Sequence, residues 1–542
     1  MVSNSVWFAL QIATWLLATC ALHKARDKED KEGNEGVKMN WRCNSAAKSM
    51  SVIHSALQYR PLPSPQYHPI NPRRPRYTTT HTAKPKIMNQ PNSQHLQKKP
   101  AFSSRAVAEI RPLVSLATPL VVGLTIATSM MLVDTAMLGP LGELPLAAVS
   151  LTTSVLIIFF AGLYGFAGPV GLLAGRAFGA NLPADVGRVA RHAAVLCTGA
   201  SVAGACLMAS VLWLLPHLNQ PPEVLAIITP YWLCISVTLI PYTLSMVAKS
   251  LLDAVDRPWL GVALVTIPVL LNIFFNYLLI YGNWGFPALG LLGAGVATLS
   301  AQLIGMTVMW LFIRLHPQFH AWWQSPGLAI EDARRHWHEG LPMSIQYLLE
   351  GGAVALAGLM IGQFGATALA GNQIALSVGA TMYMFPLGMA AAVSIRISQT
   401  IGAADTSRVA PIGVAGLGVV TGWMLMLAIT FLFGGAAIAR LFVDDAAVIS
   451  AAASIFFVFG VMQLMDGVQS VSLGALRGML DNVWPTRVSL IAYWLLALPL
   501  AWLIGFQFNV GAAGVWAGFA AGLAVAAVAL SRRFYVLSME LT

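Results

Sequence analysis

Charged side chains are scarce in this sequence. Asp, Glu, Lys and Arg together make up 10% of the 542 residues, whereas soluble domains carry about 25%. Hydrophobic residues make up 57%, and the mean hydropathy is +0.69. The scarcity of charge excludes a soluble protein. The long apolar stretches do not alternate with polar residues, so they predict helices rather than the strands of a barrel. We therefore expect an all-α integral membrane protein.

Cysteines are few, and the common catalytic motifs are missing. The five cysteines show no CxxC spacing, which argues against a disulfide framework or a cysteine metal site. The sequence contains no P-loop GxxxxGK(S/T), no HExxH and no GxSxG. ATP-driven transport and the commonest hydrolases are thereby disfavoured. We expect a protein that is not an enzyme and that needs no cofactor.

Acidic residues are missing from a long basic segment near the start of the chain. Residues 1–100 hold 15 Lys/Arg and 5 Asp/Glu, while residues 101–542 hold 17 of each. A basic excess confined to one end gives no support for nucleic-acid binding. Residues 36–100 contain 11 basic residues and no acid. We interpret residues 1–110 as a basic, disordered extension. We favour a start codon set too far upstream over a signal or anchor built on Val6–Leu22.

Twelve apolar stretches follow, most of them long enough to cross a hydrocarbon core of about 30 Å as a helix. They run approximately over residues 112–138, 146–172, 190–215, 223–248, 258–281, 290–313, 341–361, 366–395, 410–434, 447–476, 486–506 and 511–531. The even-numbered connections and the carboxyl tail hold fourteen Lys/Arg, and the odd-numbered connections hold only Arg440. Positive residues in short loops mark the cytoplasmic side. Both ends are therefore predicted to be cytoplasmic, in a multi-pass protein of a bacterial inner membrane.

The second half of the membrane region repeats the first. One constant offset aligns Pro119 with Pro342, Gly139 with Gly362, Gly165 with Gly388, and Gly179 with Gly402. Each copy holds six spans, so both enter the membrane from the same side and are related by a pseudo-two-fold axis along its normal. We expect two six-helix bundles, residues 111–315 and 341–534, with a cleft between them. The linker, residues 316–340, is expected at the cytoplasmic interface with Trp322 at headgroup level.

Only three acidic residues fall well inside the spans: Asp134, Glu350 and Asp466. A charge at the centre of a bilayer costs roughly 2.5–3.5 kcal/mol on insertion scales, so each acid requires a reason. No Lys or Arg lies at matching depth in the sequence, which argues against fixed ion pairs. Each acid must then be protonated, bind a cation or face water, and all three states suit a coupled transporter. The alternative for each is a fixed hydrogen bond between helices.

The three acids divide unequally between the two copies. Glu350 and Asp466 lie near mid-depth on two helices of the carboxyl bundle, so they can converge on a site for Na⁺ or for a proton. Asp134 lies on the other wall of the cleft, with Thr135 beside it as an oxygen donor. The repeat partners of Asp134 and Glu350 are alanines. The two bundles therefore share a scaffold but differ in chemistry.

Other polar or adaptable side chains accompany the acids. Asn272 and Asn276 share one face of the fifth span, where paired amides either join helices or line a polar cavity. Gln346 shares the face of the acid in the seventh span. Met382 and Phe385 precede a proline that is expected to kink the eighth span. They form either ordinary packing or an adaptable apolar wall for varied ligands.

Four motifs resemble the NorM-like branch of the multidrug and toxic compound extrusion (MATE) transporters. They are VDTAMLG at 133–139, EGLPMSIQYLLEGG at 339–352, FPLGMAAAVSIRISQTIGA at 385–403 and MQLMDGVQSVSLGALRGMLD at 462–481. The resemblance covers about residues 111–533. It implies twelve helices in two lobes that exchange Na⁺ or H⁺ for organic cations and other amphipathic drugs.

The same resemblance assigns roles to individual residues. It implies that Glu350 and Asp466 form the carboxyl-lobe cation site, where they would hold Na⁺ in a sodium-coupled protein. Asp134 matches the amino-lobe acid that is the proton site in another branch, and Asn272 falls at a polar position of the family. The branch usually has Tyr four residues before Asp466. This chain has Met462 there, so a hydroxyl or aromatic contact is lost.

Two other functions are weighed against export. A lipid-linked saccharide flippase of related architecture would be expected to hold pyrophosphate with Arg or Lys inside its cleft, and the spans lack both. For an intramembrane protease, Asp134 and Asp466 form a conceivable catalytic pair, but the surrounding motifs do not suit one. We expect a monomer in lipid, whose other partners are small organic cations or amphipathic drugs and Na⁺ or H⁺.

Overall fold

The computed structural model describes residues 102–218, 221–324, 327 and 329–541. The predictions for residues 1–101 lie outside this range. Within it, twelve helices are long and apolar enough to cross a membrane. The predicted fold class, an all-α membrane protein with twelve spans, is confirmed.

The first six spans form the amino lobe, and short 3₁₀ turns join several of them. Its elements are α3 (Phe102–Leu138), η2 (Gly139–Leu141), α4 (Glu143–Ala167), α5 (Pro169–Gly179), α6 (Pro183–Ser210), η3 (Val211–Trp213), η4 (Leu215–Leu218), α7 (Pro222–Ala254), α8 (Pro258–Leu279), η5 (Asn283–Gly285), α9 (Gly290–Leu315) and η6 (Pro317–Gln324). Four of these helices begin on a proline. Proline suits the first helical position because its ring fixes φ and its missing N–H has no partner there in any case.

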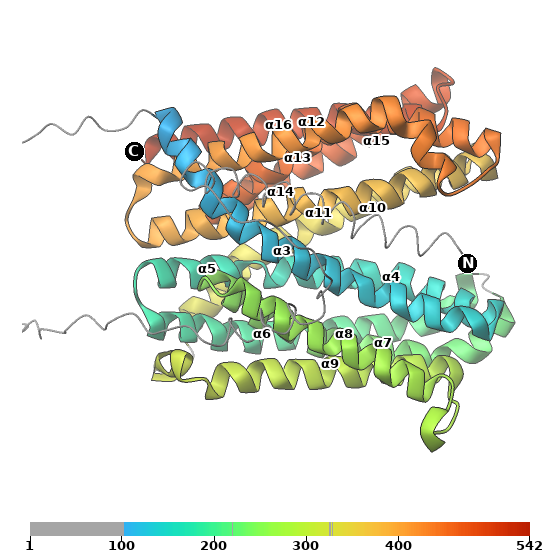
Figure 1. Ribbon diagram of the computed structural model, residues 1–542, viewed down its shortest axis with the longest axis horizontal. Helices are drawn as coiled ribbons and strands as arrows, with labels where there is room; N and C mark the ends of the chain where they lie inside the picture. The colour runs from blue at the N-terminus through green and yellow to red at the C-terminus, as the bar shows by residue number, and fades with distance from the viewer. Residues whose placement is uncertain (1–101, 219–220, 325–326, 328, 542) are drawn as a thin grey trace, which may run out of the picture. The chain divides into compact units, whose positions relative to one another are not determined.

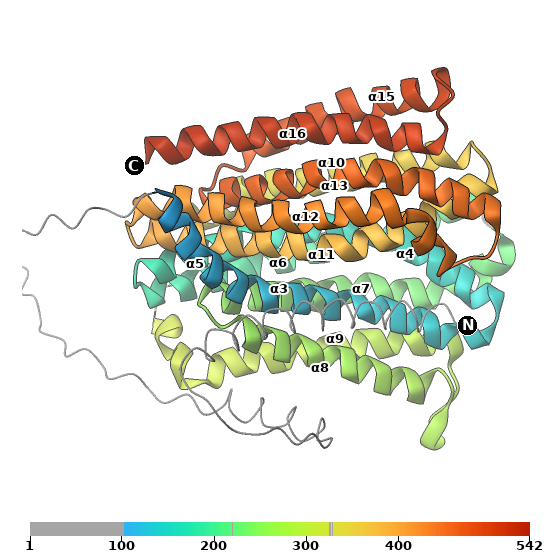
Figure 2. The same ribbon diagram turned by 45° about the horizontal axis from the view of Figure 1, so that its top comes forward.

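The remaining six spans form the carboxyl lobe, and its eleventh span combines α- and π-helical turns. Its elements are α10 (Ile330–Gly362), α11 (Ala366–Gly402), η7 (Thr406–Arg408), α12 (Val409–Arg440), α13 (Ala446–Gly478), α14 (Val483–Ser489), η8 (Leu490–Ala497), α15 (Leu498–Trp502), η9 (Leu503–Gln507) and α16 (Ala512–Glu540). Figure 1 shows α4–α9 in one half of the bundle and α10–α16 in the other. In Figure 2, α8 and α9 lie along one edge and α15 and α16 along the opposite edge. Helix α3 packs on α8 of its own lobe and on α11 and α12 of the other.

The internal repeat is visible in the backbone. Asn181 (φ 57°) and Ala404 (φ 58°) both adopt left-handed backbone, and the offset that aligns Pro119 with Pro342 also aligns these two residues. Gly142 (φ 105°) and Gly365 (φ 98°), which are aligned by the same offset, precede α4 and α11. The two lobes therefore make the same turns at the same places.

The lobes meet through a close contact that occurs twice. Gly179 at the end of α5 lies against the backbone of Gln399 in α11, where a Cβ on the glycine would stand 1.9 Å from the Gln399 carbonyl oxygen. Gly402 at the end of α11 lies against Arg176 of α5 in the same way, at 2.1 Å. Gly402 and Gln399 are the repeat partners of Gly179 and Arg176. Reciprocal contacts of this kind are what a two-fold relation between the lobes produces.

Some helices extend beyond the limits predicted from hydropathy. Helix α3 begins at Phe102, so residues 102–110 of the segment predicted to be disordered form its first turns. Helix α10 begins at Ile330, so the second half of the predicted linker continues into the seventh span. Trp322, whose depth at headgroup level stays a prediction, is buried within the protein. Gly187 of α6 permits this because it leaves room for the Trp322 backbone; a Cβ there would stand 1.7 Å from its carbonyl oxygen.

Candidate functional site

Asp134 of α3 and three other buried polar side chains meet inside the amino lobe. Asn276 Nδ2 donates to Asp134 Oδ1 (2.7 Å), and Thr298 Oγ1 donates to Asp134 Oδ2 (3.2 Å). Asn272 Nδ2 donates in turn to Thr298 Oγ1 (3.0 Å), and Asn276 Nδ2 also reaches Asn272 Oδ1 (3.2 Å). The structure thus brings Asp134, Asn272 and Asn276 together from α3 and α8. The side-chain oxygen of Asn276 is buried without a hydrogen-bond partner among the described residues, so this amino-lobe cluster keeps one free acceptor.

The threonine that contacts Asp134 is not the one expected from the sequence. Thr135 is exposed, and its hydroxyl donates to the carbonyl of Met131 (2.9 Å), so it supplies no oxygen to the cluster around Asp134. Adjacent residues of a helix point about 100° apart, which explains why the two diverge. Thr298 of α9 contributes the hydroxyl instead. No signal in the sequence pointed to it, because a threonine in an apolar helix most often bonds to its own backbone.

The two acids of the carboxyl lobe lie near each other. Glu350 of α10 and Asp466 of α13 are both partly exposed, and the negative charge of Glu350 acts on Asp466. Like charges near each other favour binding of a proton or a metal cation, because either one relieves the repulsion. That the two acids form one cation site, and which cation it holds, both stay predictions.

Two tyrosines that the sequence did not single out lie within the electric field of both carboxylates. They are Tyr383 of α11 and Tyr493 of η8. Tyr383 OH is hydrogen-bonded to Ser470 Oγ, and Tyr493 OH accepts from Gln469 Nε2 (2.7 Å). Both hydroxyls are held in place by α13, the helix that carries Asp466. Aromatic residues occur in nearly all of the spans, so sequence alone could not distinguish these two.

A cation also lies near Glu350, which corrects the prediction that none lies near the acids. The positive charge of Arg477, at the end of α13, acts on Glu350. Its guanidinium donates to Tyr347 OH (2.8 Å) and to Gln346 Oε1 (3.1 Å), and it stands 4.7 Å from the centre of the Tyr347 ring. Gln346 is therefore bound to Arg477 rather than presented to an open cleft. Sequence position placed Arg477 at a helix end, but its long side chain extends back along the span.

The apolar residues proposed for the cleft pack into the carboxyl lobe. Met462 is buried in a core of Phe, Ala and Val side chains, and Met382 packs against the same core. Phe385 lies against Trp423 with ring centres 4.8 Å apart. Met382 and Phe385 keep partial exposure. Met462 thus faces packed side chains.

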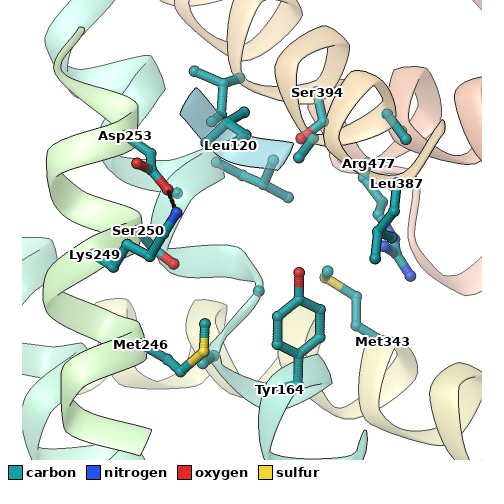
Figure 3. A pocket seen from close by; sticks show the side chains of 18 of the residues that line it. Leu120, Tyr164, Met246, Lys249, Ser250, Asp253, Met343, Leu387, Ser394 and Arg477 are labelled. Carbon is teal, nitrogen blue, oxygen red and sulfur yellow. Dashed lines mark hydrogen bonds and ion pairs between the residues drawn. The ribbon is translucent and has the colours of Figure 1, made fainter. Parts of the chain in front are cut away.

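A cavity of about 120 Å³, which we call the interlobe cavity, lies between the two lobes beside Arg477 (Figure 3). Lys249 and Asp253, one turn apart on α7, form a buried ion pair on its amino-lobe wall, with Nζ and Oδ2 2.6 Å apart. Arg477 lies on the opposite wall, and the Tyr164 hydroxyl points into the space between them. Apolar side chains complete the lining, among them Leu120, Met246, Met343 and Leu387.

One set of hydrogen bonds between the lobes lies at one end of the membrane region. This end, which we call the arginine-rich side, is where α5, α7, α11 and α13 finish. There Gln399 Nε2 donates to the Ala254 carbonyl (2.9 Å) and to Asp256 Oδ1 (3.0 Å), and Arg176 Nη2 donates to the Gly478 carbonyl (3.3 Å). Toward the other end, a Cβ on Gly358 or Gly362 of α10 would meet no described atom within 4 Å.

The comparisons with known proteins agree with this architecture. The family model MatE matches residues 119–278 and 342–503, so the two matched regions begin at Pro119 and Pro342, which are repeat partners. A "Probable multidrug resistance protein NorM" of Rhizobium meliloti is 33% identical over 420 residues, covering 74% of this chain and 88% of the relative. The protein of the same description from Pseudomonas putida is 31% identical over 434 residues, covering 79% and 94%.

Solved structures share the fold at low sequence identity. A MATE protein in a bent conformation superposes with a TM-score of 0.74 at 17% identity, covering 82% of this chain and 99% of the other. A Vibrio cholerae MATE transporter, also in a bent form, gives 0.70 at 20% identity, covering 81% and 99%. A MOP-superfamily transporter of Pyrococcus furiosus gives 0.72 at 18% identity, covering 82% and 99%.

Proposed function

Because this chain belongs to the MatE family of membrane transporters, in its NorM-like branch, we propose that it exports organic cations and other amphipathic drugs in exchange for Na⁺ or H⁺. The observation that carries the proposal is the placement of carboxylates. Asp134 lies in one lobe and the pair Glu350 and Asp466 lies in the other, and the two lobes are hydrogen-bonded to each other at the arginine-rich side. An antiporter needs such acids to hold its coupling cation and a cleft whose open end alternates.

The contacts between lobes suggest which state the structure represents. If the arginine-rich side is cytoplasmic, as the distribution of Lys and Arg predicts, the molecule is closed to the cytoplasm. Glu350 and Asp466 would then accept a cation from outside. We propose that this binding relieves their repulsion and weakens the retention of a cationic drug, which leaves outward. Rocking of the lobes would carry the cation inward.

The coupling cation is proposed to bind at the carboxyl-lobe pair. Carboxylate and hydroxyl oxygens are the hard ligands that Na⁺ prefers, and the same carboxylates can carry a proton. Tyr383 and Tyr493 supply hydroxyls near both acids. They offer the oxygen that Met462 does not. Asp134, with Asn276 and Thr298 on its two oxygens, is proposed as a second site that responds to the cation or to the drug.

The test is uptake of a fluorescent organic cation into inside-out vesicles, measured separately under an imposed Na⁺ gradient and an imposed pH gradient. The wild-type protein is expected to accumulate the dye under at least one gradient. Glu350→Gln and Asp466→Asn are each expected to lower the rate by at least about tenfold, which lies within the range of roughly 5–150-fold by which coupled sites change each other's affinity. Asp444→Asn is the matched control, because Asp444 is an exposed acid outside the spans.

Three results would contradict the proposal at different points. Wild-type transport rates in both acid variants would contradict the assignment of the cation site. Dye uptake that is the same with and without each gradient would contradict the coupling to Na⁺ or H⁺. Movement of a fluorescent lipid-linked saccharide, without movement of the dye, would favour the flippase. That alternative calls for a direct assay because the interlobe cavity does contain Lys249 and Arg477, although Lys249 is neutralised by Asp253. A monomer in the bacterial inner membrane, with both termini cytoplasmic, is part of the same proposal.

A further inference from the structure

A second pocket lies at the arginine-rich side, where the amino lobe meets the start of α10. We call it the junction pocket. Its volume is about 260 Å³, and its lining comes from the end of α5, the first turns of α6, the start of α10, and Gly402 of α11. It is separate from the interlobe cavity, since the two share no lining residue among those described. Nothing in the proposed transport cycle uses it.

Five charged residues line the junction pocket, and three of them form a cluster in which one arginine pairs with two aspartates. Arg188 Nη2 lies 3.2 Å from Asp185 Oδ1, and Arg188 Nε lies 3.1 Å from Asp332 Oδ2. The lining also contains two histidines. Both ring nitrogens of His192 are engaged by backbone groups of Arg188 and Ala329. These residues fix α6 to the start of α10 and have little capacity left for a ligand.

The other two charged residues are Arg176 and Arg335, and neither has a carboxylate partner within ion-pair distance in the described part of the chain. Their charges repel each other, and Glu339, behind the pocket, attracts Arg176 only at longer range. Arg176 uses one nitrogen on the Gly478 carbonyl, and its Nε is buried without a hydrogen bond to any described residue. Arg335 is exposed. Two arginines that line one pocket and repel each other are an arrangement that an anion bound between them would stabilise. Arginine forks match phosphate geometry in particular.

We propose that the junction pocket binds a phosphate group between Arg176 and Arg335. The source of the phosphate is either the headgroup of an anionic phospholipid or free phosphate. Basic pockets between helices at the cytoplasmic side of a membrane suit phospholipid headgroups. Leu182, which lines the pocket, and Phe178 and Trp337 beside it are exposed apolar residues that acyl chains can cover. A bound phosphate links α5 of the amino lobe to α10 of the carboxyl lobe. It therefore favours closure of the arginine-rich side.

Binding is tested on the full chain in two arms. In the lipid arm, the protein is taken from nanodiscs of phosphatidylcholine with or without phosphatidylglycerol, and retained lipid is measured by native mass spectrometry. In the free-phosphate arm, inorganic phosphate is titrated onto the detergent-solubilised protein and the thermal midpoint is followed. The variant is Arg335→Gln, since Arg335 is exposed and its loss removes no described hydrogen bond. The control is Arg334→Gln, a neighbouring exposed arginine that does not line the pocket.

The wild-type protein and Arg334→Gln are expected to retain phosphatidylglycerol in preference to phosphatidylcholine, and Arg335→Gln to bind it about tenfold more weakly. A response in the lipid arm alone identifies the headgroup. A thermal response to inorganic phosphate that Arg335→Gln loses identifies free phosphate. Equal behaviour of wild type and Arg335→Gln in both arms overturns the proposal, as does an equal loss in Arg334→Gln. Neither arm depends on transport, so failure here is distinguishable from failure of the proposed function.

Discussion

Asp134 and the pair Glu350 and Asp466 lie in different surroundings, although all three are acids inside a membrane. Asp134 has a hydrogen-bond donor on each oxygen. Glu350 and Asp466 repel each other, and no hydrogen bond to either carboxylate is described. The amino-lobe acid is therefore held in one geometry by its hydrogen bonds, which the carboxyl-lobe acids lack among the described contacts.

The first prediction concerns the network around Asp134. Asn276→Leu removes a hydrogen bond to the carboxylate and should lower the free energy of unfolding by about 1–2 kcal/mol. The thermal midpoint in detergent measures it. Asn283→Ala is the control, because the Asn283 side chain is partly exposed and its described bond is to the Tyr277 backbone. An unchanged midpoint for Asn276→Leu would show that the network contributes no stability.

The second prediction compares the contributions of Tyr383 and Met462 to binding of the coupling cation. Tyr383→Phe removes a hydroxyl near both carboxylates, so the coupling cation should bind several-fold more weakly, as expected for the loss of one polar ligand. Met462→Leu conserves volume in a packed core and should leave cation binding unchanged. The cation concentration that gives half-maximal transport measures both. Equal values for wild type and Tyr383→Phe would remove the hydroxyl from the site.

The third prediction concerns the buried pair of Lys249 and Asp253. Removing one partner leaves an uncompensated buried charge, so Lys249→Met should cost about 3–5 kcal/mol of stability. The double variant Lys249→Met/Asp253→Leu should recover most of that loss. Denaturant or thermal unfolding of the two variants decides the matter. A double variant as unstable as the single one would show that the ion pair itself, rather than its neutralisation, is required.

At the scale of single residues, the sequence singled out the buried acids more readily than the side chains that contact them. Acids in apolar spans are rare, so Asp134, Glu350 and Asp466 were visible from composition alone. The paired amides were also visible, because their spacing puts them on one helix face. Thr298, Tyr383 and Tyr493 were not, because such residues are ordinary in membrane helices. Arg477 was misjudged because its Cα lies at a helix end while its guanidinium extends inward.

At the scale of elements, the ends of α5 and α11 control how closely the lobes approach. Both helices finish on a glycine that lies against the backbone of the other helix. A methyl group at either position requires the helices to separate, since no side chain can rotate away. The hydropathy pattern predicted where these helices run, but the need for glycine became clear only from the packing.

The fourth prediction follows from that contact. Gly179→Val and Gly402→Val should each prevent full closure of the arginine-rich side and should lower transport by at least about tenfold while the protein stays folded. Cysteine labelling from the cytoplasmic side would report the opening. Gly199→Val in α6 is the control, because a Cβ there would meet no described atom within 4 Å. Normal transport by both variants would show that the closed state tolerates a wider separation.

At the scale of the whole membrane region, the number of spans, the two lobes and their symmetry could be predicted because each leaves a periodic or repeated trace in the sequence. The end at which the lobes are joined could not be predicted. It depends on contacts between residues far apart in the chain, such as Gln399 with Ala254. The junction pocket was equally invisible, since Arg176 and Arg335 are separated by more of the chain than any local pattern covers.

The paired contacts of Gly179 with Gln399 and of Gly402 with Arg176 also indicate how the two-lobe chain arose in evolution. In a homodimer, each subunit offers the same patch to the other, and every contact occurs twice. This single chain keeps that arrangement at the ends of α5 and α11. It is what gene duplication and fusion of a six-helix dimer would leave behind. The surfaces that hold the halves together have kept the ancestral symmetry, while Asp134 and Glu350, each matched by an alanine in the other half, have diverged.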